Sequence, residues 1–429
     1  MTAADTHSAI DAVWRIEQAK LIAGLARMVR DVGLAEELAQ DALVVALERW
    51  PETGIPRNPG AWLMATAKNR AIDMLRRKKL GERKYEEFQR EVEDDQPDVA
   101  EAIAVSLDDD IGDDLLSLIF TACHPVLPTD SRLALTLRLV GGLTTAEIAR
   151  AFLAAEPTIA QRIVRAKRTL SEAKVPFEVP RGADRAERLS SVLEVIYLIF
   201  NEGYAATAGE NWIRPQLVEE ALRLGRILAE LAPGEPEVHG LVALMEIQAS
   251  RIRARTGPEG EPILLPDQNR AKWDRLLIGR GLAALARAEA IGAAPGPYQL
   301  QAAIAACHAR AETAEATDWG RIAALYEALA ALTPTPVVEL NRGVAVAMAY
   351  GPEAGLAIVD ALVDDPALAR YHLLPSVRAD LLARLGRYDE ARAEAARAAE
   401  LAQNAREKAL LLDRVAAWAR ASAIPPSGG

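Results

Sequence analysis

Apolar positions recur every three or four residues over residues 34–50, which is the spacing of a helix with one buried side. The apolar side is wide and holds Leu38, Ala39, Ala42, Leu43, Ala46, Leu47 and Trp50. The opposite side is polar and mostly acidic, with Glu36, Glu37, Gln40 and Asp41. The pattern predicts an acidic amphipathic helix whose outer side faces away from the core.

A second amphipathic helix is predicted over residues 61–79, after a loop at residues 51–60 that contains Pro and Gly. Trp62 is expected in its core rather than as a base-stacking platform. Its outer side carries Asn69, Asp73 and Arg76, and it ends in the basic run Arg76, Arg77, Lys78 and Lys79. Basic residues at a helix C-terminus also oppose the macrodipole. The run therefore fits simple helix stabilisation as well as contact with an anionic partner.

Residues 141–170 predict two short helices around a tight turn. Thr144 stands three residues before Glu147, which is the capping-box spacing that begins a helix. Pro157 suits the first turn of the next helix, where a backbone N–H has no intrahelical partner. An inward stripe is expected from Ile159, Ile163, Ala166 and Leu170.

The outward side of that second helix is cationic and polar. Gln161, Arg165 and Arg168 follow at i, i+4 and i+7, with Arg162 beside them. Arg can donate two hydrogen bonds to guanine and Gln can pair with adenine, so such a helix suits a DNA major groove. A solvated helix in an α-helical bundle is the alternative.

Residues 81–114 are acidic, with 14 Asp and Glu against 3 Lys and Arg, and they predict a flexible spacer. At ~3.3 Å per residue the spacer reaches at most about 110 Å, whereas DNA modules two helical turns apart need about 70 Å. Helices over residues 115–123 and 130–140 are expected to brace the helix-turn-helix.

From about residue 185 the pattern changes to alanine-rich helices separated by Pro and Gly turns. The run Leu385 to Ala391 is typical of the turn inside a tetratricopeptide repeat, with Ala391, Ala395 and Ala398 at packing spacing. Ala395 departs from that pattern, which has a large aromatic residue there. We expect degenerate repeats of helical hairpins that stack into a solenoid with a concave groove.

Residues 191–216 concentrate aromatic side chains, for which two interpretations stay open: a packed junction between domains or a ligand pocket. These side chains are Tyr197, Phe200, Tyr204 and Trp212. Residues 253–269 show no helix or strand period and predict a loop.

Composition narrows the class of protein. A chain of 429 residues suggests two to four domains, and its low aromatic content with abundant Ala, Leu, Glu and Arg favours helix almost throughout. We expect no transmembrane helix, no export signal and no disulfide framework, since there are only two cysteines, Cys123 and Cys307. The net charge of −11 equals the excess of acidic over basic residues in the spacer alone. The net charge therefore does not argue against nucleic-acid binding elsewhere in the chain.

The order of these elements resembles one family. An acidic helix, a loop, an Ala-Trp-Leu…Ala-x-Asn-x-x-x-Asp-x-x-Arg helix over 61–76, an acidic spacer and a helix-turn-helix are similar to the extracytoplasmic-function sigma factors of bacterial RNA polymerase. The resemblance covers about residues 9–175. The long tail resembles the subgroup with a C-terminal extension of helical repeats.

The resemblance implies specific roles. The side chains of Glu36, Glu37, Gln40 and Asp41 would contact the clamp helices of core polymerase, with the flap as a further contact of the protein. Contacts to the −10 element would come from Arg57, Asn58, Asn69, Arg70, Asp73, Arg76 and Arg77. Contacts to the −35 element would come from Thr158, Gln161, Arg162, Arg165 and Arg168. Ala155 departs from the family, which has a capping Ser or Thr there. The acidic spacer would mimic nucleic acid in a polymerase channel, or serve only as a solubilising linker.

We therefore predict an all-α cytoplasmic protein with two small helical sigma modules, residues 1–80 and 115–180, joined by the acidic linker 81–114. An α-solenoid-like helical repeat domain at 185–429 would regulate them in cis or through a regulatory protein or ligand. The alternative function is a helix-turn-helix regulator or adaptor that is not a sigma subunit. No phosphate loop, nucleophile elbow, zinc helix or dinucleotide fingerprint occurs, so we expect no enzyme, cofactor or metal site, and no membrane partner.

Overall fold

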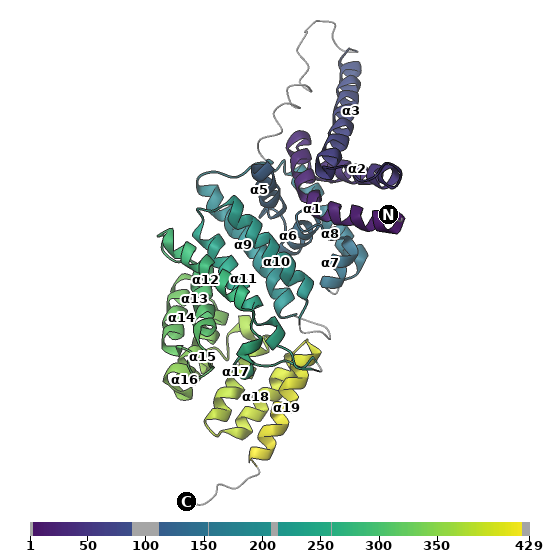
Figure 1. The fold of residues 1–429 in the computed structure, drawn as a ribbon. Helices are drawn as coiled ribbons and strands as arrows, with labels where there is room; N and C mark the ends of the chain where they lie inside the picture. The colour runs from purple at the N-terminus through teal and green to yellow at the C-terminus, as the bar shows by residue number, and fades with distance from the viewer. Residues whose placement is uncertain (1–2, 88–110, 153, 207–212, 259, 423–429) are drawn as a thin grey trace, which may run out of the picture. The chain divides into compact units, whose positions relative to one another are not determined.

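The computed structural model describes residues 3–87, 111–152, 154–206, 213–258 and 260–422. These residues form 18 α-helices and no strand, so the all-α prediction is confirmed (Figure 1). They divide into two compact units, residues 1–195 and residues 196–429. The boundary falls inside one helix, α9 (Ala183–Tyr204).

The first three helices of the N-terminal unit are α1 (Ala3–Val29), α2 (Val32–Thr53) and α3 (Pro59–Glu87). The predicted apolar side of α2 is the buried one, and Trp50 at its end is 1% exposed. Trp62 of α3 packs edge-on against Trp50, with 5.2 Å between the ring centroids, but it is only half-buried, so it borders the core rather than lying within it as predicted. Helix α3 runs eight residues beyond its predicted end, into the segment expected as a flexible spacer. The other end of that segment is also helical, because residues 111–114 begin the next helix and Asp114 is buried, so the predicted spacer was too long at both ends. Its middle, residues 88–110, lies outside the described residues.

The same unit holds α5 (Ile111–Ala122), α6 (Thr129–Leu139), α7 (Thr145–Ala151) and α8 (Glu156–Glu172). The predicted capping box is present, since the Thr144 hydroxyl accepts from the N–H of Glu147 and the Glu147 carboxylate accepts from the N–H of Thr144. Although burial alone raises it, hydrogen bonds from Thr144 and the cation of Arg15 hold the pKa of Glu147 below its ordinary value. The cap therefore fixes where α7 begins.

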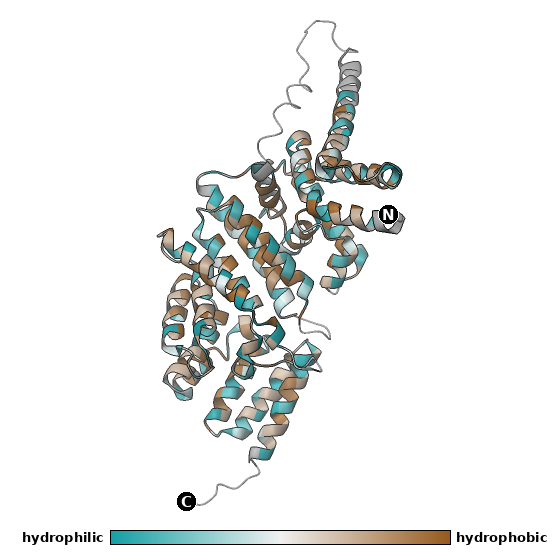
Figure 2. Ribbon diagram, in the orientation of Figure 1, coloured by the Kyte–Doolittle hydropathy of each residue, from teal (hydrophilic) through white to brown (hydrophobic). Residues whose placement is uncertain are grey.

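The C-terminal unit continues α9 as a series of helices, most of which pack against their neighbours in the chain. They are α10 (Pro215–Leu231), α11 (Pro236–Ala249), α12 (Arg275–Ala290), α13 (Pro297–Arg310), α14 (Trp319–Leu332), α15 (Pro336–Tyr350), α16 (Pro352–Asp360), α17 (Leu373–Arg384), α18 (Tyr388–Leu401) and α19 (Ala405–Ser422). Many carry an apolar and a polar side, as the two colours along each ribbon show (Figure 2). The loop predicted at 253–269 contains the short 3₁₀ turns Ile252–Ala254 and Leu265–Asp267.

The turn that was predicted from residues 385–391 connects α17 and α18. Gly386 has φ +74°, a left-handed conformation that glycine adopts without steric cost. The predicted packing alanines of α18, Ala391, Ala395 and Ala398, are fully buried. The hairpin is present as expected, and its membership of a repeat series stays a prediction.

Close contact between α15 and α16 depends on two glycines. A Cβ at Gly355 would lie 2.5 Å from the carbonyl oxygen of Gly343, closer than real Cβ atoms come. We expect Gly355→Ala to lower the free energy of unfolding by about 1–3 kcal/mol, because the helices must move apart. Gly279→Ala on α12, where nothing lies within 4 Å, should instead stabilise by about 0.5–1 kcal/mol. Urea unfolding of the full chain measures both, and equal effects would contradict the close-contact explanation.

Candidate nucleic-acid interface

Helix α8 presents the side predicted to face DNA. Thr158, Gln161, Arg165 and Arg168 are exposed and Arg162 is half-exposed. The predicted inward stripe, Ile159, Ile163, Ala166 and Leu170, is buried. Helix α8 begins after Ala155, which makes no side-chain capping bond, and Pro157 occupies its first turn. Thr158 and Arg168 are ten residues apart, so the exposed row extends about 15 Å along the helix.

The cations of this row differ in their partners. Nη2 of Arg162 lies 3.1 Å from Oδ2 of Asp130, and Nε of Arg168 donates to Glu172 at 2.6 Å. Among the described residues, no carboxylate lies within ion-pair distance of Arg165. Exposed ion pairs are weak, about 0–1 kcal/mol, so all three cations can reach an oxyanion or base edge, and Arg165 can do so without breaking a pair.

The predicted −10 residues lie along the exposed side of α3. Arg57 and Asn58 precede the helix, and Asn58 begins it, because its Oδ1 accepts from the N–H of Ala61 at 3.1 Å. Asn58 and Asn69 are eleven residues apart, close to three turns, and so share a side. Asn69, Arg70, Asp73 and Arg76 are all exposed on α3. The side chain of Arg77 lies outside the described residues.

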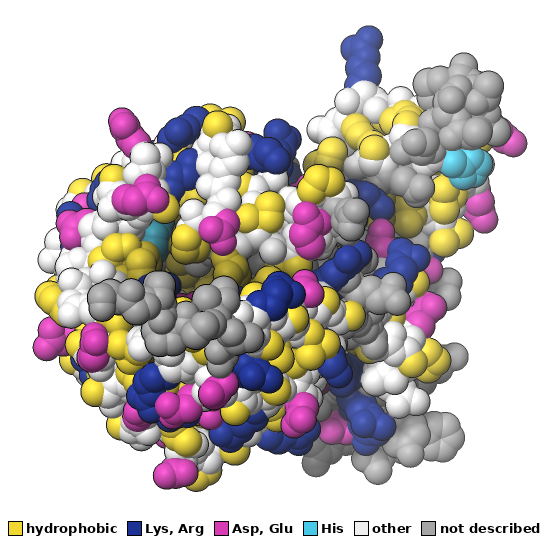
Figure 3. Space-filling model, turned by 90° about the horizontal axis from the view of Figure 1, so that it is seen from below, with side chains coloured by type: hydrophobic (Ala, Val, Ile, Leu, Met, Phe, Trp, Pro, Cys, Tyr) yellow, Lys and Arg dark blue, Asp and Glu magenta, His cyan; other side chains and the backbone are white. Residues whose placement is uncertain are grey.

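Charge on these surfaces is mixed. Nη1 of Arg70 lies 2.7 Å from Oδ2 of Asp41, which connects a predicted DNA contact on α3 to a predicted polymerase contact on α2. Acidic and basic side chains are interspersed over the one face of the molecule that Figure 3 shows. On α3 and α8, attraction to phosphate depends on the particular cations that are exposed.

One of the four predicted polymerase contacts is not exposed, which corrects the expected outward side of α2. Glu37 and Asp41 are exposed and Gln40 is half-buried, but Glu36 is only 2% exposed. The helical pattern alone placed Glu36 on the solvent side, whereas the fold brings a second module against it.

Glu36 is bound by cations from two helices of the second module. Its Oε1 accepts from Nε of Arg138 on α6 at 2.7 Å and from Nε2 of Gln40 at 2.9 Å, and its Oε2 pairs with Nζ of Lys167 on α8. The carbonyl oxygen of Arg138 in turn accepts from Nε2 of Gln18 on α1 at 3.0 Å. A nearly fully buried carboxylate with two cationic partners is expensive to expose alone, so it holds the modules together.

Two further ion pairs join the same modules. Nε of Arg27 lies 3.3 Å from Oδ1 of Asp114, and Nη2 of Arg15 lies 3.3 Å from Oε1 of Glu147. Asp114 is buried, whereas Arg15 is exposed, so the first pair contributes more than the second. The residues of α8 and α3 that are predicted to contact DNA therefore belong to modules that contact each other directly.

A structural contact that the sequence did not indicate comes from α9. Nη2 of Arg188 donates to the carbonyl oxygen of Phe120 at 2.9 Å, and Oγ of Ser191 donates to that of Cys123 at 2.6 Å. These carbonyls lie at the C-terminal end of α5, where a helix has no backbone partners of its own. Arg132 of α6 donates to Ser191 and to Glu194 from the other side. No short motif encodes such a contact.

Next to α9, Cys123 is buried and His124 is half-buried. Burial raises the pKa of the Cys123 thiol to about 12, and the hydrogen bond with Thr136 offsets only part of this rise. Burial and the cation of Arg188 lower the pKa of His124 to about 4. Cys123 is thus a protonated residue of the core.

Comparisons with known families agree with this geometry. The model of sigma-70 region 2 matches residues 15–80, which cover the second half of α1, all of α2 and most of α3. The model of sigma-70 region 4 matches residues 117–170, which span α5 to α8. The chain belongs to the sigma-70 factor family. Its two regions and long C-terminal extension are consistent with an extracytoplasmic-function sigma factor.

The extension also has relatives. A family of unknown function (DUF6596) matches residues 188–289, beginning within α9. An uncharacterized protein of Rhizobium meliloti (strain 1021) is 46% identical over 397 residues, which cover 92% of each chain. In the parts of this sigma factor that the structure describes, no helix is both long enough and apolar enough to traverse a lipid bilayer. A sigma factor acts in promoter recognition, with core polymerase and promoter DNA as its partners.

Proposed function

We propose that this sigma factor reads the −35 element with α8 and the −10 element with α3 and its preceding loop, while Glu37, Gln40 and Asp41 of α2 contact the clamp helices. The exposed row on α8 is the observation that carries the proposal, because it presents Gln161 and Arg165 above a fully buried stripe. Region 2 and region 4 in one chain favour a sigma subunit over an ordinary helix-turn-helix regulator.

The purified chain should bind core polymerase in the absence of DNA and support run-off transcription from its own promoters. Purification with core polymerase, followed by sequencing of transcript start sites, identifies those promoters. An ordinary regulator would bind duplex DNA but require a separate sigma subunit for transcription. Failure to bind core polymerase would therefore contradict the proposal.

Arg165→Ala is expected to weaken promoter binding by about 1–3 kcal/mol at the base that the side chain reads. Arg168→Ala is the matched control on the same exposed row. We expect this change to weaken promoter binding less, because Arg168 already donates a hydrogen bond to Glu172. Binding of each variant to a set of promoters with single −35 substitutions measures both. An equal loss on every sequence would show that Arg165 contacts phosphate only.

Promoter binding also requires the modules to separate. Elements two helical turns apart on DNA need about 70 Å between the reading surfaces, but Glu36 of region 2 pairs with Lys167, a residue of the −35 reading helix itself. We infer that the packed arrangement is a resting state and that promoter engagement breaks the Glu36 contacts. In that open state Glu36 would also become available to core polymerase.

The C-terminal unit is proposed to regulate the sigma regions, in cis or through a partner that binds its stacked helical hairpins. Support comes from α9, which supplies hydrogen bonds to region 4 and continues without a break into the second unit. A chain ending at residue 195 keeps those hydrogen bonds, and its promoter activity in cells should differ from that of the full chain. Equal activity would remove the C-terminal unit from regulation.

A further inference from the structure

Two arginines are buried in the C-terminal unit at the end of α11. Arg251 and Arg255 each keep only 8% of their surface exposed. Both pack on one aromatic ring, with the guanidinium carbons 5.9 Å and 3.6 Å from the ring centroid of Tyr204. Arg251 also lies 5.9 Å from the ring centroid of Trp273.

Arg251 has no acidic partner. Its Nη2 donates to Oε1 of Gln248, its buried Nε has no hydrogen-bond acceptor, and no described carboxylate lies within ion-pair distance of it. Glu246 of α11 pairs with Arg226, and Glu407, whose charge acts on Arg255, has its Oε2 3.2 Å from Nε2 of His372. A buried guanidinium without an anion is unusual, because charges that leave water are normally paired.

The surroundings of Arg251 add positive charge rather than offset it. Arg270 lies over the other side of this cluster, 4.6 Å from the centroid of Trp273, and donates to the carbonyl oxygens of His308 and Ala311. Burial, together with the cations of Arg251 and Arg270, lowers the pKa of His308 to about 4. Burial also lowers the pKa of Arg255, and the cation of Arg251 adds to this effect, whereas Tyr204, which hydrogen-bonds Arg255, and the charge of Glu407 oppose it.

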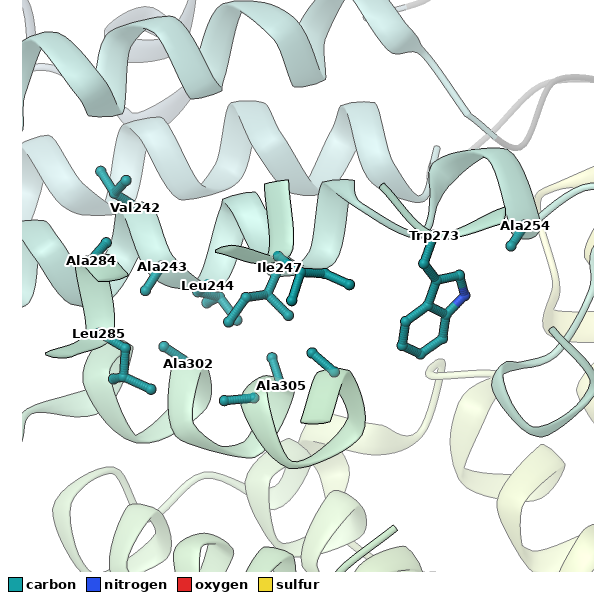
Figure 4. Packing of buried hydrophobic residues seen from close by; sticks show 13 residues of the cluster. Val242, Ala243, Leu244, Ile247, Ala254, Trp273, Ala284, Leu285, Ala302 and Ala305 are labelled. Atoms are coloured by element: carbon teal, nitrogen blue, oxygen red, sulfur yellow. The ribbon is translucent and has the colours of Figure 1, made fainter. Parts of the chain in front are cut away.

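Contacts with the aromatic rings offset only part of the cost of burying these arginines. The attraction of a cation to a ring is weaker than the cost of burying an ion that has no counter-charge. Figure 4 shows Trp273 and Ala254 at one end of an apolar cluster that otherwise comes from α11, α12 and α13. The Nε of Arg251 and the Nε1 of Trp273 are both buried N–H groups without acceptors.

We propose that Arg251 and Arg255 form a binding site for an oxyanion, the carboxylate or phosphate group of a small molecule. The anion supplies the charge that Arg251 lacks and accepts hydrogen bonds from its guanidinium. Both arginines and Tyr204 lie within residues 188–289, so the site gives the family of unknown function a ligand-binding role. This inference is independent of the promoter contacts.

The test uses the full chain in Tris chloride at constant ionic strength, with inorganic phosphate and acetate as separate probes. Arg251→Gln is compared with Arg287→Gln, an exposed arginine of α12 in the same unit. Phosphate or acetate should raise the unfolding temperature of the wild type and of Arg287→Gln more than that of Arg251→Gln. Calorimetric titration should show binding to Arg251→Gln weakened at least about tenfold, the loss expected for a hydrogen bond to a charged group.

The unfolding temperature in the absence of added oxyanion is a second measurement, for which the expected order of the two proteins is reversed. Arg251→Gln should then unfold at the same or a higher temperature than the wild type, because an unpaired buried charge has been removed. A lower unfolding temperature, with no response of the wild type to either probe, would show that the guanidinium is a structural group held by the rings. Equal responses of wild type and Arg251→Gln would show a general salt effect and would equally overturn the site.

Discussion

Glu36→Lys is expected to separate region 2 from region 4 of this sigma factor. The substitution places a third cation beside Arg138 and Lys167 in a buried position, where the loss of the ion pairs costs about 3–5 kcal/mol. We expect the radius of gyration from small-angle scattering to rise while the helical content stays unchanged. Because only the open form can span both promoter elements, promoter affinity should increase at least about tenfold.

Glu37→Lys is the matched control for this change. It alters the same charge on the same helix, but Glu37 is exposed and makes none of the contacts to α6 or α8. Adding Lys167→Glu to Glu36→Lys restores one attraction and should recover part of the compact form. Scattering and promoter binding that are identical for Glu36→Lys and Glu37→Lys would show that the Glu36 contacts do not hold the modules together.

A chain ending at residue 180 is expected to unfold at a markedly lower temperature than one ending at residue 195. The shorter chain lacks Arg188, Ser191 and Glu194, so the carbonyl oxygens of Phe120 and Cys123 lose the donors that satisfy them. Leaving a buried polar group without its partner costs about 1–3 kcal/mol. Because two such groups lose their donors, we expect the unfolding temperature of a domain of this size to fall by about 5–15 °C, as measured by circular dichroism.

Ser191→Ala in the full chain isolates one of these bonds, with the exposed neighbour Ser190→Ala as its control. A loss of stability in the first variant only is the expected result. If the chains ending at residues 180 and 195 unfold at the same temperature, α9 is not part of the region 4 fold. The comparison also matters for regulation, because a deletion at residue 180 alters promoter activity through instability alone.

Some residues that hold the packed state lie directly beside the predicted DNA and polymerase contacts or are among them. Lys167 lies on the helix that carries Gln161 and Arg165, yet it points to Glu36 of region 2 rather than to the exposed row. Asp41 and Arg70 pair across α2 and α3, so polymerase binding by Asp41 would release a cation beside the −10 residues. Each of the two partners thus competes with a contact that the free protein makes within itself.

Local sequence determined the helices and most of the exposed site. The capping box at Thr144, Pro157 in the first turn of α8, and the buried stripe from Ile159 to Leu170 all act within one or two helical turns, so the pattern predicts them directly. The same periodicity placed Arg165 and Gln161 on the exposed side. The turn at Gly386 and the buried alanines of α18 follow from similarly short-range rules.

Only the tertiary structure decided which polar residues are buried. The helical pattern places Glu36 on the polar side of α2, but contacts with Arg138 and Lys167 bury it, and these residues are 102 and 131 positions away in the chain. Arg188, Ser191 and Arg251 were likewise indistinguishable from surface residues until distant segments met them. The reason is physical: helical periodicity reports which side of a helix is apolar, but a buried charge depends on partners that no local spacing encodes.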